Sequence, residues 1–108
     1  MTIEATILNS LKPRFSLGLI TLTQGFMEAC VTREITEMRA NELISRHAVG
    51  DWGDVCEVDA GKNNIESVNK GMILSKYTIP AAADTSFEVY VITDPGHDTT
   101  IVLLTSEY

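Results

Sequence analysis

A change in hydrophobic period at Gly71 constrains the fold of this chain more than any other feature. After Gly71, apolar and polar residues alternate in three segments, which are residues 72–79 (MILSKYTI), 86–93 (SFEVYVIT) and 99–104 (TTIVLL). Successive side chains of a strand point to opposite faces of a sheet, so a period of two predicts strands. The connections at 80–85 and 94–98 are short and rich in turn residues, which favours an antiparallel meander.

Before Gly71 the pattern has the period of a helix in three segments, residues 24–31, 36–48 and 57–70. In the third segment we expect Ala60, Ile65 and Val68 to face inward. Residues 15–23 (FSLGLITLT) alternate like a strand, and Thr23 can cap the helix that follows. A length of 108 residues fits one domain. The sequence therefore predicts a single α+β domain over residues 1–108, with one early strand, two to three helices and then a three-stranded antiparallel meander.

The composition excludes several classes of protein. Eight Lys and Arg residues stand against 15 Asp and Glu residues, and 8 − 15 gives a net charge of −7. This charge disfavours direct binding to nucleic acid or to an anionic membrane, because both require clustered Lys and Arg. The N-terminus does not have the pattern of a signal peptide, and no run approaches the roughly 18 apolar residues of a membrane span. We expect a cytoplasmic protein without a cofactor, with Cys30 and Cys56 as free thiols.

The most distinctive segment is residues 47–59 (HAVGDWGDVCEVD), which contains the only Trp of the chain. Two glycines flank the Asp51-Trp52 pair and permit a sharp bend. One interpretation is structural. In it Trp52 fills the core, Asp51 or Asp54 caps the third helix, and His47 packs at the end of the second helix.

Two other interpretations make the same segment functional. A histidine beside carboxylates can act as an acid or a base, so His47, Asp51 and Asp54 are candidates for catalysis. They could also hold a divalent metal, but the spacing His-x3-Asp-x2-Asp matches no established metal motif, and we predict none. Alternatively, Asp51, Trp52 and Asp54 form a recognition surface. His97, in the turn at 94–98, is expected to be exposed to solvent.

The motif His-x-x-Gly-Asp-Trp-Gly-Asp at residues 47–54 resembles a motif of small proteins from bacterial plasmids and integrative elements, sometimes labelled plasmid-related proteins. The resemblance extends over about residues 15–108, including an Asp/Asn-containing helix at 59–63 and a Thr-Thr-x-Leu-Leu strand with a final Glu-Tyr at 99–108. This chain departs from the group at Ala48-Val49, in a longer apolar turn at 80–83, and at His97-Asp98, where a basic residue is expected. The resemblance implies a mobile-element context and no established reaction.

Three hypotheses of function follow. The first is a non-enzymatic, acidic interaction module that binds another protein with a basic surface, for example as an inhibitor of a host defence protein or a nucleic-acid-binding protein. The second is a small ribonuclease or toxin of the barnase or RelE type, with His47 or His97 and Asp51 as the acid–base pair and Lys76 as the cation for phosphate. The third is a homodimer held by an apolar patch or by an uncovered strand at residues 100–104.

Overall fold

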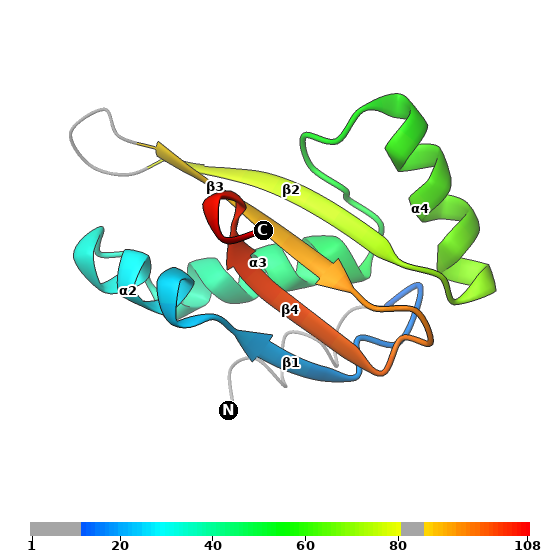
Figure 1. The fold of residues 1–108 in the computed structure, drawn as a ribbon, viewed down its shortest axis with the longest axis horizontal. Helices are drawn as coiled ribbons and strands as arrows, with labels where there is room; N and C mark the ends of the chain where they lie inside the picture. The colour runs from blue at the N-terminus through cyan, green and yellow to red at the C-terminus, as the bar shows by residue number, and fades with distance from the viewer. Residues whose placement is uncertain (1–11, 81–85) are drawn as a thin grey trace.

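The computed structural model describes residues 12–80 and 86–108, which form one four-stranded sheet and three α-helices (Figure 1). In chain order the elements are β1 (Leu19–Leu22), α2 (Gln24–Thr32), α3 (Glu37–Ala48), α4 (Glu57–Asn69), β2 (Ile73–Pro80), β3 (Ser86–Thr93), β4 (Thr99–Leu104) and the 3-10 helix η1 (Thr105–Glu107). This order confirms the predicted α+β class. Residues 1–11 of the predicted domain and residues 81–85 of the predicted connection lie outside the described residues.

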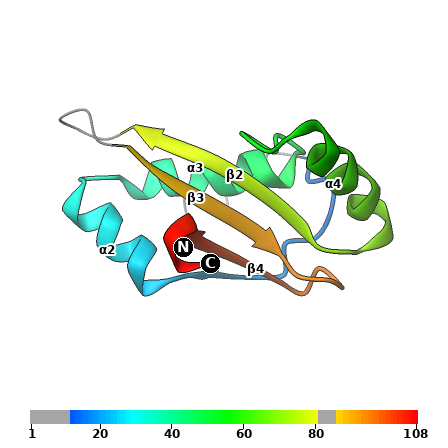
Figure 2. The same cartoon turned by 45° about the horizontal axis from the view of Figure 1, so that its top comes forward.

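The strands lie in the order β1-β4-β3-β2. The two pairs within β2–β4 are antiparallel, as the meander predicts, whereas β1 runs parallel to β4. Helix α3 runs across one face of the sheet and α2 lies beside it (Figures 1 and 2). Helix α4 lies beside the edge strand β2, at the other end of the molecule from α2.

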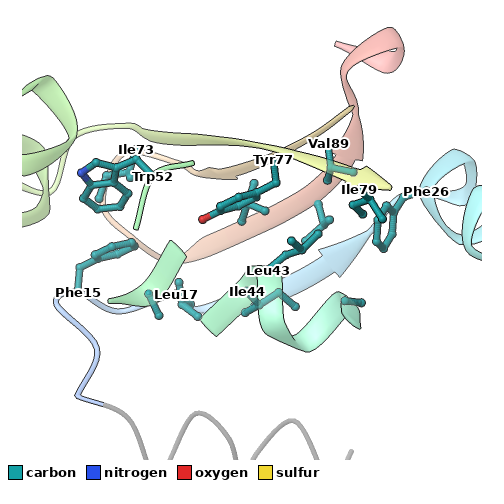
Figure 3. Packing of buried hydrophobic residues seen from close by; sticks show 14 residues of the cluster. Phe15, Leu17, Phe26, Leu43, Ile44, Trp52, Ile73, Tyr77, Ile79 and Val89 are labelled. Atoms are coloured by element: carbon teal, nitrogen blue, oxygen red, sulfur yellow. The ribbon is translucent and has the colours of Figure 1, made fainter. Parts of the chain in front are cut away.

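The face of the sheet that α3 covers holds the hydrophobic core. Alternate residues of β2 are buried, so that Ile73, Tyr77 and Ile79 point toward α3. Figure 3 shows these side chains packed with residues from α2, from α3, from the segment before β1 and from the connection between α3 and α4, including Phe15, Leu17, Phe26, Leu43, Ile44 and Trp52. Threonine side chains cap α2 and α3 at Thr23 and Thr36, as expected for helix N-termini.

The early strand is shorter than predicted, since it covers only Leu19–Leu22 of residues 15–23. Gly18, with φ +63°, turns the chain into β1, and the Leu19 N–H donates to the Asp98 carbonyl over 2.9 Å. A Cβ at Gly18 would lie 2.0 Å from that same carbonyl oxygen, so only glycine fits here. Phe15 and Leu17 precede the turn and pack into the core outside any strand.

Strand β4 is in the interior of the sheet, between β1 and β3. The prediction that residues 100–104 form an uncovered edge is therefore wrong, because the parallel pairing with β1 covers that side along residues 99–102. The sequence pattern gave no indication of this partner, which lies about eighty residues earlier in the chain.

The orientation predicted for the third helix is also wrong. In α4 the buried residues are the polar Asn63 and Ser67. Ile65 and Val68 face outward with 60% and 79% of their surface exposed, and Ala60 is only partly buried. The physical reason is that the backbone N–H and C=O of Leu74, on the edge strand β2, require hydrogen-bond partners. The Asn63 side chain supplies both, so the polar face of the helix turns inward.

Candidate functional site

Residues 51–54 form a corner between α3 and α4, and Trp52 anchors it to the core. The indole is 6% exposed and lies beside Phe15 (Figure 3). Its ring centroid lies 6.1 Å from that of Phe15 and 5.9 Å from that of His47. Its Nε1–H donates to Asn64 Oδ1 over 3.1 Å, and the Arg14 guanidinium lies over the ring at 5.6 Å. The hydrogen bond satisfies the polar end of a buried ring. This geometry matches the interpretation of Trp52 as a core residue.

The backbone of the corner covers part of the outer edge of β2. The Lys76 N–H donates to the Trp52 carbonyl over 3.1 Å, and the Asp54 N–H donates to the Lys76 carbonyl over 2.7 Å. Gly53, between them, has φ +73°, and a Cβ there would lie 2.0 Å from the Lys76 carbonyl oxygen. One step along β2, the Asn63 side chain both donates to and accepts from the Leu74 backbone. Along residues 74–76 this edge is therefore closed to pairing with a foreign strand.

The two aspartates of the corner hold its shape and keep their carboxylates at the surface. Asp51 accepts from Arg46 Nε over 2.7 Å and from the Gly53 N–H over 3.3 Å. The hydrogen bond from Arg46 is the main reason that the pKa of Asp51 lies below its ordinary value. Asp54 accepts from the Thr78 hydroxyl over 3.0 Å. The prediction that one of these residues caps the third helix is wrong, since the N-cap of α4 is Cys56, without a side-chain hydrogen bond.

His47, near the C-terminal end of α3, is fully buried and central to a hydrogen-bonded chain of hydroxyl groups. Its Nδ1 lies 2.6 Å from Ser75 Oγ, and its Nε2 lies 2.9 Å from Thr93 Oγ1. The chain continues from Thr93 to Thr100 over 2.7 Å and ends where the Thr100 hydroxyl donates to the Leu17 carbonyl over 2.7 Å. The network thus connects the strands β2, β3 and β4 with α3 and with the segment before β1.

The last acceptor fixes the direction of every proton in this chain. A carbonyl only accepts, so Thr100 donates its proton to Leu17 and must accept from Thr93. Thr93 in turn accepts from His47, which therefore carries its proton on Nε2. Nδ1 is then an acceptor for the Ser75 hydroxyl. His47 is the neutral Nε2–H tautomer, with both ring nitrogens satisfied.

Burial determines what this histidine can do chemically. Desolvation of the charged ring, with a smaller contribution from the charge of His97, lowers the pKa of His47 from 6.5 to about 3. The hydroxyl partners Ser75, Thr93 and Thr100 are between 0% and 1% exposed. A substrate cannot reach these groups without opening the core. The geometry is therefore that of a satisfied buried polar network, which favours one packing of the core over others.

His97 is buried too, and the expectation that it is exposed to solvent is wrong. It is 4% exposed, with φ +58°, and its Nε2 lies 2.9 Å from the Gly71 carbonyl. The ring packs against Phe15, with the centroids 5.2 Å apart, while His47 contacts the same phenyl ring at 5.3 Å. Tight folding of the 94–98 turn against the end of α4 explains the burial, since the Gly96 N–H donates to the Lys70 carbonyl.

Lys76 does not join the two imidazoles. On β2 it follows Ser75, and neighbouring residues of a strand point to opposite faces. Its Nζ lies 3.2 Å from Glu88 Oε2 on the face of the sheet that α3 does not cover. The convergence of His47, His97 and Lys76 that a ribonuclease would require is therefore not seen.

Other features of the described residues do not form a site around these groups. Within residues 12–80 and 86–108, no three His, Cys, Asp or Glu side chains gather as metal ligands would. Two surface hollows, of about 330 Å³ on α2 and about 150 Å³ between α4 and β2, contain none of the candidate residues in their lining. Neither cysteine in this part of the chain forms a disulfide. No helix over the same ranges is long and apolar enough to cross a membrane.

Comparison with known proteins places the chain in no family. A scan of protein-family models, a search of curated proteins and a search of solved structures each gave no significant match.

Sequence reasoning missed the residues that organise the site from the sheet side. They are Ser75, Thr93, Thr100 and Asn63. A signal was present for the first three, because each hydroxyl occupies an inward position of an otherwise apolar strand face. Such a position requires a hydrogen-bond partner, which is His47 for Ser75 and Thr93, and Thr93 and the Leu17 carbonyl for Thr100.

Proposed function

We propose that this chain is a non-enzymatic protein-interaction module, whose acidic surface binds a basic surface on another protein. The observation that supports it most directly is the construction of the 51–54 corner. Its backbone is fixed to β2 and its indole is buried, yet both aspartate side chains remain at the surface, with that of Asp51 half exposed. A surface that is rigid before binding loses little conformational entropy when it binds.

The net charge of −7 supports the same proposal through the rate of encounter. An acidic protein is steered toward a basic partner, and charge complementarity affects selectivity and association rate more than affinity. In this proposal Asp51 and Asp54 make the polar contacts. Trp52, as a buried residue, contributes by holding the corner in shape.

The resemblance to plasmid and integrative-element proteins suggests which partners to test first. Host defence nucleases and other nucleic-acid-binding proteins carry basic grooves for their substrates. An acidic module that occupies such a groove would act as an inhibitor. We propose that role, in the context of a mobile element, for this chain.

The test is a titration against purified basic nucleases, with the dissociation constant measured at several salt concentrations. We expect binding that weakens as salt rises, and a several-fold loss of affinity in Asp54→Asn. Asparagine can still accept the hydrogen bond from Thr78, so the corner should keep its shape. Glu34→Gln is the matched control, because it removes the same charge from an exposed residue on the α2–α3 connection.

Two outcomes would count against the proposal. One is a failure to bind any basic nuclease even at low salt. The other is an equal loss of affinity in Asp54→Asn and Glu34→Gln, which would show that net charge alone matters and that the corner is not the contact surface.

A further inference from the structure

Helix α4 carries its three valine and isoleucine residues on the side away from the protein. Val58, Ile65 and Val68 are 69%, 60% and 79% exposed, whereas Asn63 and Ser67 are buried. At 3.6 residues per turn the three apolar residues lie on one face. In both views the helix stands at the end of the molecule beside β2, and nothing among the described residues packs on its outer side (Figures 1 and 2).

Gly61 lies on this same outward face, between Val58 and Ile65. A glycine in the middle of a helix costs about 1 kcal/mol relative to alanine. At Gly18 and Gly53 a Cβ would collide with backbone, but a Cβ at Gly61 would meet no atom of the described residues within 4 Å. Residues 12–80 and 86–108 therefore give no steric reason for this glycine, and a close approach from outside would give one.

The charged residues along one border of the apolar face alternate in sign, in the order Asp59, Lys62 and Glu66 on α4 and then Lys70, which is the C-cap of the helix. Among the described residues none of the four takes part in an ion pair within the chain. Their sum is zero, in contrast to the net charge of −7 for the whole chain. This border therefore offers no attraction for a strongly basic partner, and it allows two acidic molecules to approach without local repulsion.

Alternating charges at this spacing are complementary to themselves when two copies of the helix pack antiparallel. With the two-fold axis between Asn64 and Ile65, the residues before it on one helix lie opposite, to within one residue, the residues after it on the other. Gly61 then faces the partner's Val68, and Ile65 faces the partner's Ile65. On the border, Lys62 faces the partner's Glu66, and Asp59 faces the partner's Lys70. Every contact occurs twice, as an isologous interface requires.

We propose that α4 is a self-association surface, through which two copies of this chain form an antiparallel helix pair with Gly61 at the close contact. The inference is independent of the proposed binding of a basic partner, which uses the 51–54 corner. One face of a 13-residue helix is small beside the roughly 800 Å² per partner of a standard interface. The dimer should accordingly be weak, with a dissociation constant in the micromolar range.

The first experiment is sedimentation velocity of the full chain over a range of concentrations. We expect a shift from the 11.9 kDa monomer toward twice that mass as the concentration rises into the micromolar range. Val68→Asp should abolish the shift, because it places a charge against Gly61 of the other copy. Val31→Asp on α2 is a matched control, since Val31 and Val68 are both 79% exposed, and it should leave the dimer unchanged.

The second experiment uses charge reversal, which requires no change in the apolar face. Lys62→Glu alone places two acids opposite each other, and Glu66→Lys alone places two bases opposite each other. Each should weaken self-association by about tenfold. An equimolar mixture of the two single variants should recover association as a heterodimer. This recovery requires that the two positions face each other across the interface.

The proposal is overturned if the chain remains monomeric to several hundred micromolar, or if Val68→Asp and Val31→Asp have the same effect. It is also overturned if the mixture of charge variants associates no better than either alone. Circular dichroism of each variant checks that α4 remains folded. Because all four substituted positions are at the surface of the monomer, loss of folding is not expected.

Discussion

The buried imidazole of His47 makes the stability of the fold depend on pH in a way that can be calculated. The pKa of His47 is about 3 in the folded state, against an ordinary value of 6.5 in the unfolded chain. Between these values the unfolded state binds more protons, so the free energy of unfolding falls as the pH falls below 6.5. The full loss, reached near pH 3, is about 5 kcal/mol, and at pH 5 it is about 2 kcal/mol.

The assay is urea denaturation at pH 7.5, 6 and 5, followed by the fluorescence of the single, buried Trp52. Carboxylates also take up protons at the acid end, and this relieves repulsion in a chain of charge −7, so the two trends oppose each other. His47→Gln separates them, because it removes the imidazole and keeps a donor and an acceptor for Ser75 and Thr93. The wild type should lose about 2 kcal/mol more than this variant between pH 7.5 and pH 5.

A measurement on the wild type alone provides a check if His47→Gln does not fold. The ring proton resonances of His47 should not titrate between pH 8 and pH 5. A His47 resonance that titrates near pH 6.5 would refute the reasoning, because it would mean that the ring is solvated. Equal loss of stability in wild type and His47→Gln would refute it as well.

Three further predictions concern residues of the corner and of α4. Trp52→Ala should lower the free energy of unfolding by about 3 kcal/mol or more, measured with urea and far-UV circular dichroism, and a normal melting curve would contradict the assignment of Trp52 to the core. Gly53→Ala should destabilise the fold by several kcal/mol, because its Cβ would collide with the Lys76 carbonyl. Gly61→Ala should instead raise the stability of the dilute monomer by about 0.5–1 kcal/mol. Similar results for the two variants would show that the close approach at Gly53 is incorrect. Asn63→Ala should leave the Leu74 backbone without its side-chain partners and lower the free energy of unfolding by about 1–3 kcal/mol. It should also increase aggregation, measured by light scattering. Unchanged stability and solubility would show that this edge does not need to be covered.

The sequence was sufficient to predict the elements and the α+β class, because both rest on local periodicity and on capping residues such as Thr23 and Thr36. The burial of Trp52 was also predictable, because burying a large indole is favourable and the two flanking glycines permit the bend that this requires. For the corner, the residues could be named but their partners could not. Asp51 or Asp54 was expected to cap the third helix, but Asp51 accepts from Arg46 and Asp54 accepts from Thr78.

The errors arise where a distant part of the chain determines which face is buried. Ile65 and Val68 are apolar and periodic, but the need of Leu74 for hydrogen-bond partners decides that Asn63 turns inward. His97 is in a turn, yet contacts with Phe15 and with the Gly71 carbonyl bury it. Periodicity gives the spacing of an apolar face, and it does not show what that face meets.

The parallel pairing of β1 with β4 has a consequence for biosynthesis. Residues 19–22 leave the ribosome long before residues 99–102, and those later residues are their only partners in the sheet described here. A sheet whose first strand pairs with its last has a high contact order and cannot be completed before residues 99–102 have been synthesised. Until then, the nascent chain should contain helices but an incomplete sheet with exposed apolar residues. Chaperone binding is expected mainly during this stage of synthesis.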